Sequence, residues 1–223
     1  FGNPALGLND GFQAVSRYWD RITHPAQVIQ SLPAVLATLL DPADCGPAFI
    51  ALPQDVQGWT YDYPLSFFAP KLHRIRQQMP DSRELVDAIV VLKAAKRPAI
   101  IAGGGVQYAG AVKTLADFAE AANIPVIETI AGRANMLADH ALNIGPVGVT
   151  GSNSGNWLAE RADVILTVGS RLQDFTTGSW TAFAQDAQFI SLNTARHDAN
   201  KHRALPLVGD AKLGLMALKA EIG

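Results

Sequence analysis

Residues 97–105 read RPAIIAGGG, a short apolar run that ends in three consecutive glycines. Residues 98–102 carry only small or apolar side chains, which predicts a buried strand. Gly103, Gly104 and Gly105 follow directly. Glycine tolerates the tight turns and positive φ values that occur where a strand passes into a helix. This stretch therefore predicts the first strand–turn–helix step of an α/β fold.

Apolar runs alternate with amphipathic segments on both sides of this stretch. Helices are predicted at residues 82–95, 109–122, about 156–163, and 210–222. Further strands are predicted at residues 125–128, 164–168, 189–192 and 205–208. Strands that are apolar throughout and alternate with helices are typical of a parallel sheet covered on both faces. The predicted fold class is α/β: a Rossmann-like parallel sheet with helices on both faces, whose strand order changes beside the first strand.

The first part of the chain is organised differently. A helix is predicted over residues 27–40, where Pro33 kinks it or marks its start, and a buried strand over 48–52. The segment after residue 56 loses periodicity and carries several prolines, which is typical of a linker. Asp81 and Glu84 then have the spacing of a capping box at the start of the next helix. The predicted division is a partial domain at 1–56, a linker at 57–81 and a complete domain at 82–223.

The start of the chain suggests a piece of a longer protein. Phe1 stands where a methionine would be expected, and residues 1–20 hold no complete structural unit. We therefore expect an excised fragment rather than a processed or trimmed native chain.

Composition narrows the possible classes of protein. Hydrophobic residues make up 48% of the chain and charged residues 17%, as in soluble proteins with a sizeable core. The net charge of -2 favours neither a nucleic-acid nor an acidic-membrane partner. Cys45 is the single cysteine, so no disulfide can form within the chain and a cytoplasmic location is expected. Cys45 is predicted to be a small buried residue. No apolar run approaches the roughly 20 residues that span a bilayer.

The three glycines allow two interpretations. A turn between a strand and a helix can cradle a phosphate against helix amides. The dinucleotide-binding fingerprint needs a third glycine three positions on, where this chain has Tyr108. Glu128 ends the next strand, where a ribose-binding acid would lie. The alternative is a tight turn that only needs glycine for its backbone conformation.

The loop GPVGVTGSNSGN at 145–156 is the more ligand-like segment. It combines flexible backbone with Ser and Asn side chains, leads into a helix, and follows a strand at the ligand side of an open sheet. The candidate contacts in this loop are Gly148, Gly151, Ser152 and Asn153. The alternative is a helix-capping loop, with Ser154 or Gly155 near the cap.

A second candidate group follows the later strands. Gly169, Ser170 and Arg171 come after strand 164–168, and Asn193 comes directly after strand 189–192. Arg171 could bind a phosphate or carboxylate, or form a surface ion pair. His197 and His202 are five positions apart without an acid at metal-site spacing, so no metal site is predicted.

Two stretches resemble a known family. The first contains ITHP at 22–25 and GPAFIALPQDV at 46–56. It resembles the end of the pyrimidine-binding domain of thiamine-diphosphate-dependent enzymes such as acetolactate synthase. The second stretch, 82–222, resembles the whole central domain of those enzymes. Its marks are RPAIIAGGG at 97–105, IPV at 124–126, the glycine loop at 145–151, ADVILTVGSR at 162–171, and the final Gly209–Asp210.

Three shorter segments point to one branch of that family. YWDRI at 18–22, LDPADCGPA at 40–48 and QDVQG at 54–58 resemble the hydrolases of inositol catabolism. The resemblance implies a parent that cleaves a C–C bond of an inositol-derived cyclic 1,2-diketone, with thiamine diphosphate and Mg²⁺, as a homodimer or homotetramer. An acetolactate-synthase-like carboligase domain and a stand-alone nucleotide-binding module remain the alternatives.

The resemblance also implies what this chain lacks. The glutamate that activates the cofactor belongs to an earlier part of the first domain, and the Gly-Asp-Gly motif for metal and diphosphate belongs to a third domain. The chain contains no Gly-Asp-Gly. No catalytic residue is therefore expected here, and the fragment alone is predicted to be inactive. An Asp-rich segment of FAD-binding relatives reads SLNTA at 191–195, which argues against FAD.

Overall fold

The structure is a computed structural model that describes residues 7–222. The chain divides into two compact units, Phe1–Arg76 and Gln77–Gly223. The two units carry separate sheets, one of two strands and one of six.

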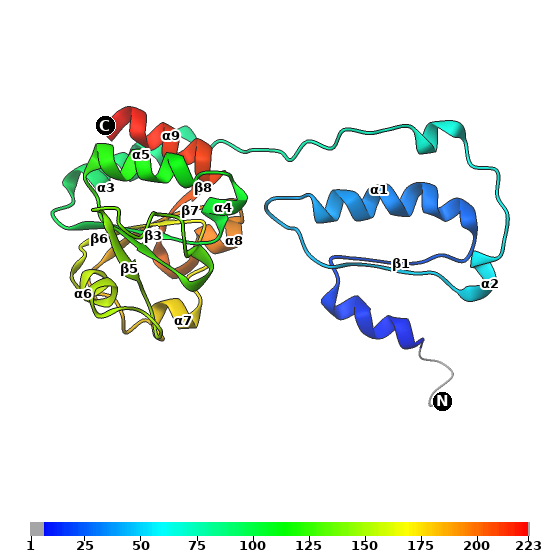
Figure 1. The fold of residues 1–223 in the computed structure, drawn as a ribbon, viewed down its shortest axis with the longest axis horizontal. Helices are drawn as coiled ribbons and strands as arrows, with labels where there is room; N and C mark the ends of the chain where they lie inside the picture. Colours follow the sequence, from blue (N-terminus) through cyan, green and yellow to red (C-terminus); the bar gives the residue numbers. More distant parts are fainter. Residues whose placement is uncertain (1–6, 223) are drawn as a thin grey trace. The chain divides into compact units, whose positions relative to one another are not determined.

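The second unit is built on the six-stranded sheet, in which all neighbouring strands are parallel (Figure 1). The strands are β3 Pro98–Ala102, β4 Val126–Glu128, β5 Asn143–Pro146, β6 Val164–Val168, β7 Gln188–Asn193 and β8 Leu205–Val208. Their order is β5-β4-β3-β6-β7-β8, so the direction in which strands are added reverses between β3 and β6. The predicted parallel sheet is confirmed, including the change of order beside strand 98–102.

Helices cover both faces of this sheet, as predicted (Figure 1). One face carries α3 Ser82–Ala94, α5 Val112–Ala122 and α9 Ala211–Ile222. The other carries α6 Asn153–Arg161 and the short α7 Asp174–Thr177. Short helical turns complete the unit at α4 Gly105–Tyr108, η4 Ile130–Gly132, α8 Arg196–Ala199 and η5 Lys201–Arg203.

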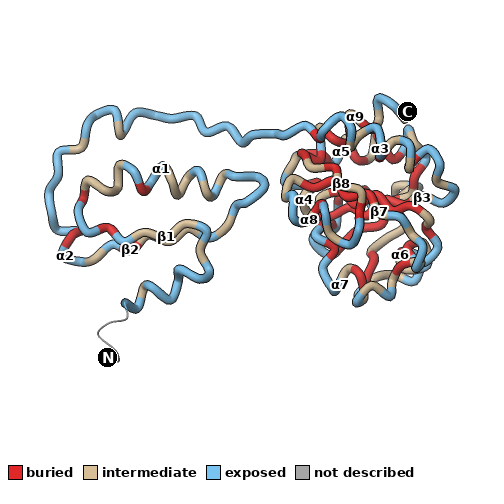
Figure 2. Tube along the Cα trace, turned by 180° about the vertical axis from the view of Figure 1, so that it is seen from behind, coloured by how far each residue is buried: buried red, intermediate tan, exposed pale blue. Residues whose placement is uncertain are grey.

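The core consists of two apolar layers separated by the sheet. The larger layer packs Leu115, Phe118 and Leu215 against strand residues such as Leu166. The smaller layer packs Ile165 with residues of α6 and of the segment between β6 and β7. Buried residues accordingly concentrate along the strands (Figure 2). This burial on both faces explains why the strands read as continuous apolar runs.

Three details differ from the sequence-based predictions. The helix predicted over 109–122 starts later, at Val112, because Gly110 adopts φ +60 and separates α5 from the short α4 before it. The region 131–155, expected to be a loop, contains the edge strand β5. Asp81 caps α3, but the capping box predicted with Glu84 does not form. Asp81 accepts from the Arg83 backbone N–H at 2.8 Å, but Glu84 instead accepts from the Val208 backbone N–H at 3.0 Å.

The first unit contains a parallel pair of strands, β1 Tyr18–Arg21 and β2 Ala48–Ala51. Its helices and turns are η1 Leu8–Val15, η2 Pro25–Gln27, α1 Val28–Leu39, α2 Gln54–Gln57 and η3 Leu65–Phe68. The predicted helix near 27–40 is present as α1, with Pro33 inside it rather than at its start. Phe49 stacks on Phe12 with ring centroids 4.6 Å apart. Few side chains of this unit are fully buried (Figure 2).

Candidate functional site at the carboxyl edge of the sheet

The glycine turn after β3 is packed against the end of β6. The backbone N–H of Gly103 donates to the Val168 carbonyl at 2.9 Å, and that of Gly105 donates to the Gly169 carbonyl at 2.9 Å. A Cβ on Gly105 would lie 2.6 Å from the Gly169 Cα. Protein backbone therefore occupies the place where a phosphate would approach these amides. The geometry favours the tight-turn interpretation over a dinucleotide site.

Glu128 is also used inside the protein. Its side chain is 2% exposed, Oε1 accepts from the Met136 backbone N–H at 2.9 Å, and Oε2 lies 3.7 Å from Arg133 Nη1. Neighbouring Asn135 donates from Nδ2 to the Gly103 carbonyl at 2.8 Å. These contacts tie the loop after β4 to the glycine turn. The Glu128 carboxylate is therefore bound within the protein, at the position where a dinucleotide site would have its ribose-binding acid.

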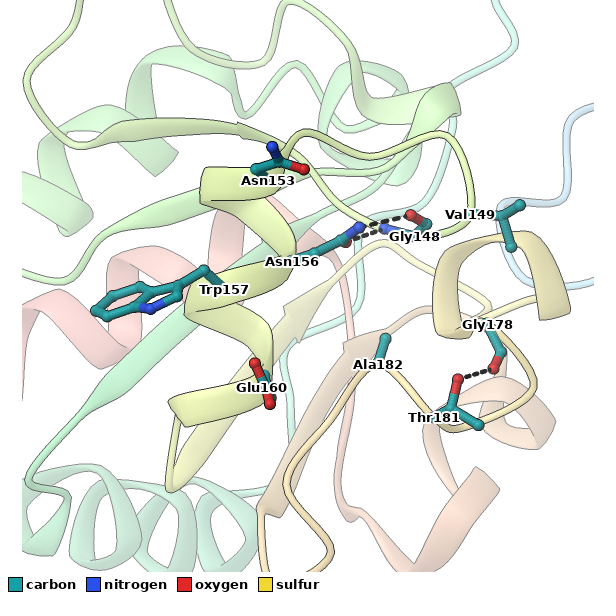
Figure 3. A pocket seen from close by; sticks show the side chains of 9 residues that line it. All are labelled: Gly148, Val149, Asn153, Asn156, Trp157, Glu160, Gly178, Thr181 and Ala182. Carbon is teal, nitrogen blue, oxygen red and sulfur yellow. Dashed lines mark hydrogen bonds between the residues drawn. The ribbon is translucent and has the colours of Figure 1, made fainter.

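The loop after β5 is held by a side chain of α6. Asn156 accepts from the Gly148 N–H at 2.8 Å and donates to the Gly148 carbonyl at 3.0 Å, as Figure 3 shows. Gly148 has φ +106, and a Cβ there would lie 2.2 Å from the Phe175 carbonyl oxygen. A Cβ on Gly151 would lie 2.7 Å from Asn156 Oδ1. Both glycines are thus required by close packing.

Ser152 is the N-cap of α6. Its Oγ accepts from the Gly155 backbone N–H at 3.0 Å. The cap lies before Ser154 and Gly155, the positions suggested from the sequence, and α6 accordingly starts at Asn153 rather than near residue 156. The loop does cap α6, through Ser152 rather than Ser154 or Gly155, whereas the side chain of Asn153 remains at the surface (Figure 3).

The second predicted group comes together at the ends of β6 and β7. Asn193 donates from Nδ2 to the Ser170 carbonyl at 3.0 Å and accepts at Oδ1 from the Ala195 N–H at 3.0 Å. Ser170 Oγ accepts from the Leu172 N–H at 3.1 Å. Gly169 adopts φ +59 against the glycine turn. Arg171 is exposed, and within residues 7–222 its guanidinium forms no ion pair.

The two predicted groups are linked through the segment between the strands. We call residues 169–187, which run from the end of β6 to the start of β7, the β6–β7 crossover. The Val149 backbone N–H donates to the Phe175 carbonyl of this crossover at 2.9 Å. The loop after β5 therefore rests on the same segment that starts with Gly169, Ser170 and Arg171.

A groove of about 550 Å³ lies between α6 and the crossover. The α6 wall consists of Asn153, Asn156, Trp157 and Glu160, which recur at the spacing of one helix face. The remaining walls are Gly148, Val149, Gly178, Thr181 and Ala182 (Figure 3). Trp157, Glu160 and the crossover residues were not predicted, although the spacing along α6 could have indicated the first two.

The groove contains few free chemical groups. Glu160 pairs with Arg161 at 2.7 Å, and the Arg161 guanidinium lies 4.7 Å from the Trp157 ring centroid. Thr181 Oγ1 donates to the Gly178 carbonyl. Across residues 7–222, no cluster of three or more His, Cys, Asp or Glu side chains could hold a metal ion. The groove can form hydrogen bonds, but it brings no nucleophile and base together.

Two further findings concern single predictions. Cys45 is exposed, so its prediction as a buried residue is wrong. It follows the turn at Asp41, whose carboxylate accepts from the backbone of Ala43 and Asp44, and this turn keeps the residue at the surface. No helix in the described part of the chain is long and apolar enough to cross a membrane.

Comparisons with known proteins identify the relatives of this chain. The family model described as "Thiamine pyrophosphate enzyme, central domain" matches residues 85–218. A 3D-(3,5/4)-trihydroxycyclohexane-1,2-dione hydrolase from Geobacillus thermodenitrificans is 42% identical over 219 residues, which cover 98% of this chain and 34% of the relative. The hydrolase of the same name from Clostridium tetani is 42% identical over 221 residues, covering 99% of this chain and 34% of the relative.

The fold also has a solved counterpart. An X-ray structure described as a thiamin diphosphate-dependent enzyme from Mycobacterium smegmatis aligns with a TM-score of 0.73 and 24% identity. The alignment covers 92% of this chain and 39% of the other. The chain spans about one third of the length of the curated relatives that it matches. The predicted family is confirmed: residues 85–218 place this chain in the family of thiamine pyrophosphate enzymes, as their central domain.

Proposed function

We propose that the chain is the central part of a thiamine-diphosphate-dependent hydrolase that cleaves a C–C bond of an inositol-derived cyclic 1,2-diketone. The observation that carries this proposal is the extent of the similarity. Identity of 42% runs over 219 residues, so it includes the first unit as well as the family domain. Relatives that shared only the central fold would be expected to match residues 85–218 and to diverge outside them.

We propose that the residues that hold the cofactor lie outside this chain. Mg²⁺ is bound through carboxylate and carbonyl oxygens together with the phosphates of its ligand. No suitable cluster occurs among residues 7–222, and the sequence lacks Gly-Asp-Gly. We propose that thiamine diphosphate and Mg²⁺ bind to other parts of the parent, and that the parent is a cytoplasmic homodimer or homotetramer. FAD is not expected to bind.

We propose that the first unit, up to residue 56, is the end of the pyrimidine-binding domain, and that 57–81 is a linker to the central domain at 82–223. Two strands alone make a marginal sheet, and parallel strands normally occur in sheets covered on both faces. β1 and β2 pair only with each other in the described chain. Residues 59–63 and 69–81 contain no helix or strand, as expected for a linker.

Any ligand of the central domain is proposed to contact Gly148, Gly151, Ser152 and Asn153, or Gly169, Ser170, Arg171 and Asn193. Asn153 and Arg171 are the members with exposed side chains. The side chains of Ser152, Ser170 and Asn193 are engaged within the protein. We therefore expect Asn153 and Arg171 to supply the side-chain contacts.

The decisive experiment uses the full-length parent. It is supplied with Mg²⁺, thiamine diphosphate and either the inositol-derived diketone or pyruvate. Ring opening of the diketone supports the hydrolase. Acetolactate formed from pyruvate, with the diketone unchanged, would reject the hydrolase and favour the carboligase alternative. Crystals of the chain soaked with FAD or a nucleotide test the third alternative, which requires density at Gly103–Gly105.

A further inference from the structure

Two buried hydroxyl groups on adjacent strands have no hydrogen-bond partner among the described residues. Thr167 is 0% exposed and Ser191 is 2% exposed. They are direct register partners in the parallel pair β6 and β7. Within residues 7–222, neither Thr167 Oγ1 nor Ser191 Oγ is hydrogen-bonded to another protein atom. A buried hydroxyl without a partner is costly, so this pair requires an explanation.

Both hydroxyls lie on the sheet face that the β6–β7 crossover covers. Ile165 and Phe189 precede them by two positions, and both pack in the layer that contains Leu172 of the crossover. Side chains two positions apart on a strand lie on the same face of the sheet. Thr167 and Ser191 therefore stand side by side beneath protein, where bulk solvent does not reach them.

The neighbouring polar groups are already occupied. Asn193, the next residue on this face of β7, uses Nδ2 on the Ser170 carbonyl and Oδ1 on the Ala195 N–H. Ser170 Oγ accepts from the Leu172 N–H. The two hydroxyl groups therefore lie between the apolar layer and the hydrogen-bonded carboxyl ends of β6 and β7.

The spacing of the strands suits one bridging molecule. Neighbouring strands lie about 4.8 Å apart, so side chains in register face each other at about that distance. One water molecule with two hydrogen bonds of about 2.8 Å can span such a gap. Buried waters in proteins typically bond to polar groups of this kind.

We propose that Thr167 and Ser191 form an internal water site that bridges β6 and β7 directly below Ser170 and Asn193. The water accepts from one hydroxyl and donates to the other. By joining the two strands at this level, it fixes the separation of their carboxyl ends, where Ser170 and Asn193 meet. The proposal is independent of the reaction of the parent enzyme.

A crystal structure of the 223-residue chain, at a resolution that orders internal waters, tests the site directly. We expect a density peak within hydrogen-bonding distance of both Thr167 Oγ1 and Ser191 Oγ. Direct bonding of the two hydroxyls to each other or to backbone carbonyls, with no peak between the strands, would overturn the proposal.

A double-mutant cycle provides a test that depends on energies. Thr167→Val or Ser191→Ala alone leaves the water and the other hydroxyl poorly satisfied, so each is expected to raise the unfolding equilibrium constant about five- to tenfold. The double variant removes all polar members and should be little worse than either single one. If no water is bound, each substitution removes an unpaired hydroxyl. The single variants would then stabilise the chain, and their effects would multiply.

A matched pair controls for nonspecific effects of these substitutions. Thr177 is a buried threonine whose Oγ1 already donates to the Asp174 carbonyl at 3.3 Å. Thr177→Val combined with Ser191→Ala should give effects that multiply, because Thr177 does not share a partner with Ser191. Non-multiplicative behaviour in this control pair, equal to that of the Thr167 pair, would remove the support for a specific bridge.

Discussion

At the scale of single residues, the glycines of the carboxyl edge differ in what surrounds them. Gly148 has φ +106, and a Cβ there would lie 2.2 Å from the Phe175 carbonyl oxygen. Gly110 has φ +60 and open space around the same position. Gly110→Ala should cost about 1 kcal/mol, from backbone strain alone. Gly148→Ala should cost about 3 kcal/mol or more, because a steric clash adds to the strain. Urea unfolding of both variants checks this, and equal losses would contradict it.

Asp163 gives a residue-scale prediction of pH dependence. Its carboxylate accepts from the backbone N–H groups of Lys96 at 2.8 Å and Arg97 at 2.9 Å, joining the starts of β3 and β6. Partial burial opposes ionisation of Asp163, but these hydrogen bonds outweigh it and lower the pKa of the carboxyl below 3.8. The resulting stabilisation is present above the ordinary pKa and is lost as the pH falls through the folded-state pKa.

The matched variant is Asp163→Asn, which keeps the shape but lacks the charge. We expect it to lower the free energy of unfolding by about 1 kcal/mol at pH 7, and to reduce the stability difference between pH 6 and pH 3. Denaturant titrations at both pH values measure this. An unchanged pH dependence in the variant would show that other carboxylates dominate.

At the scale of elements, sequence patterns predicted those strands whose own side chains are apolar on both faces. β3 and β6 were predicted with the same bounds that they have in the structure. β5 reads NIGP, and glycine and proline are atypical of strands, so the sequence pattern does not indicate a strand here. This edge strand forms through pairing with β4. β1 reads YWDR and contains two charged residues. Such strands are specified by their neighbours, which local periodicity cannot reveal.

The candidate site was predictable to a similar extent. Glycine-rich loops after strands correctly indicated which segments gather at the carboxyl edge. The contact of Gly148 with Phe175 depends on how the β6–β7 crossover folds back, and its contact with Asn156 depends on how the loop returns to α6. No local pattern encodes either contact. The occupied amide groups of the Gly103–Gly105 turn likewise result from packing between β3 and β6.

Trp180 of the β6–β7 crossover contacts His202, which lies after β7, and this contact predicts a pH dependence. The His202 ring lies 3.7 Å from the Trp180 ring, centroid to centroid, and both residues have positive φ. Partial burial and the charge of Lys201 lower the pKa of His202 below 6.5. Lys201, the charged neighbour of His202, itself forms an ion pair with the carboxylate of Asp198. A lowered histidine pKa means that the unfolded chain takes up the proton more readily, so stability decreases as the pH falls below about 6.5.

Trp180 fluorescence provides the measurement for this contact. Acidification from pH 8 to pH 5 should change the emission of the wild-type chain, and Trp180→Phe identifies the part that arises from Trp180. His202→Asn, which tolerates a positive φ, should remove that pH-dependent part. A titration of Trp180 emission that persists unchanged in the Asn variant would show that His202 is not the group responsible.

At the scale of the whole molecule, the two units differ in how much structure they can support alone. Within the residues that the structure describes, the second unit has a six-stranded sheet and two apolar layers, whereas the first has two strands and few buried side chains. Residues 77–223, expressed alone, should therefore unfold cooperatively, as small single domains do. Residues 1–76 alone should be degraded rapidly by protease, because two strands make a marginal sheet. Limited proteolysis and thermal unfolding of both pieces test this. A cooperative transition of the first piece would show that it is an independent domain.

The same asymmetry predicts how the chain behaves toward the cofactor of its family. A thiamine diphosphate site needs oxygen ligands for Mg²⁺ and donors for the diphosphate. Residues 7–222 offer no acidic cluster, and the backbone amides of Gly103 and Gly105 are already hydrogen-bonded within the sheet. Calorimetric titration of the chain with thiamine diphosphate and Mg²⁺ should show no saturable heat, while the full-length parent should bind under the same conditions. Micromolar binding by the chain alone would contradict this. It would mean that the central domain contributes cofactor ligands of its own, and Arg171→Ala would then test whether the exposed guanidinium is one of them.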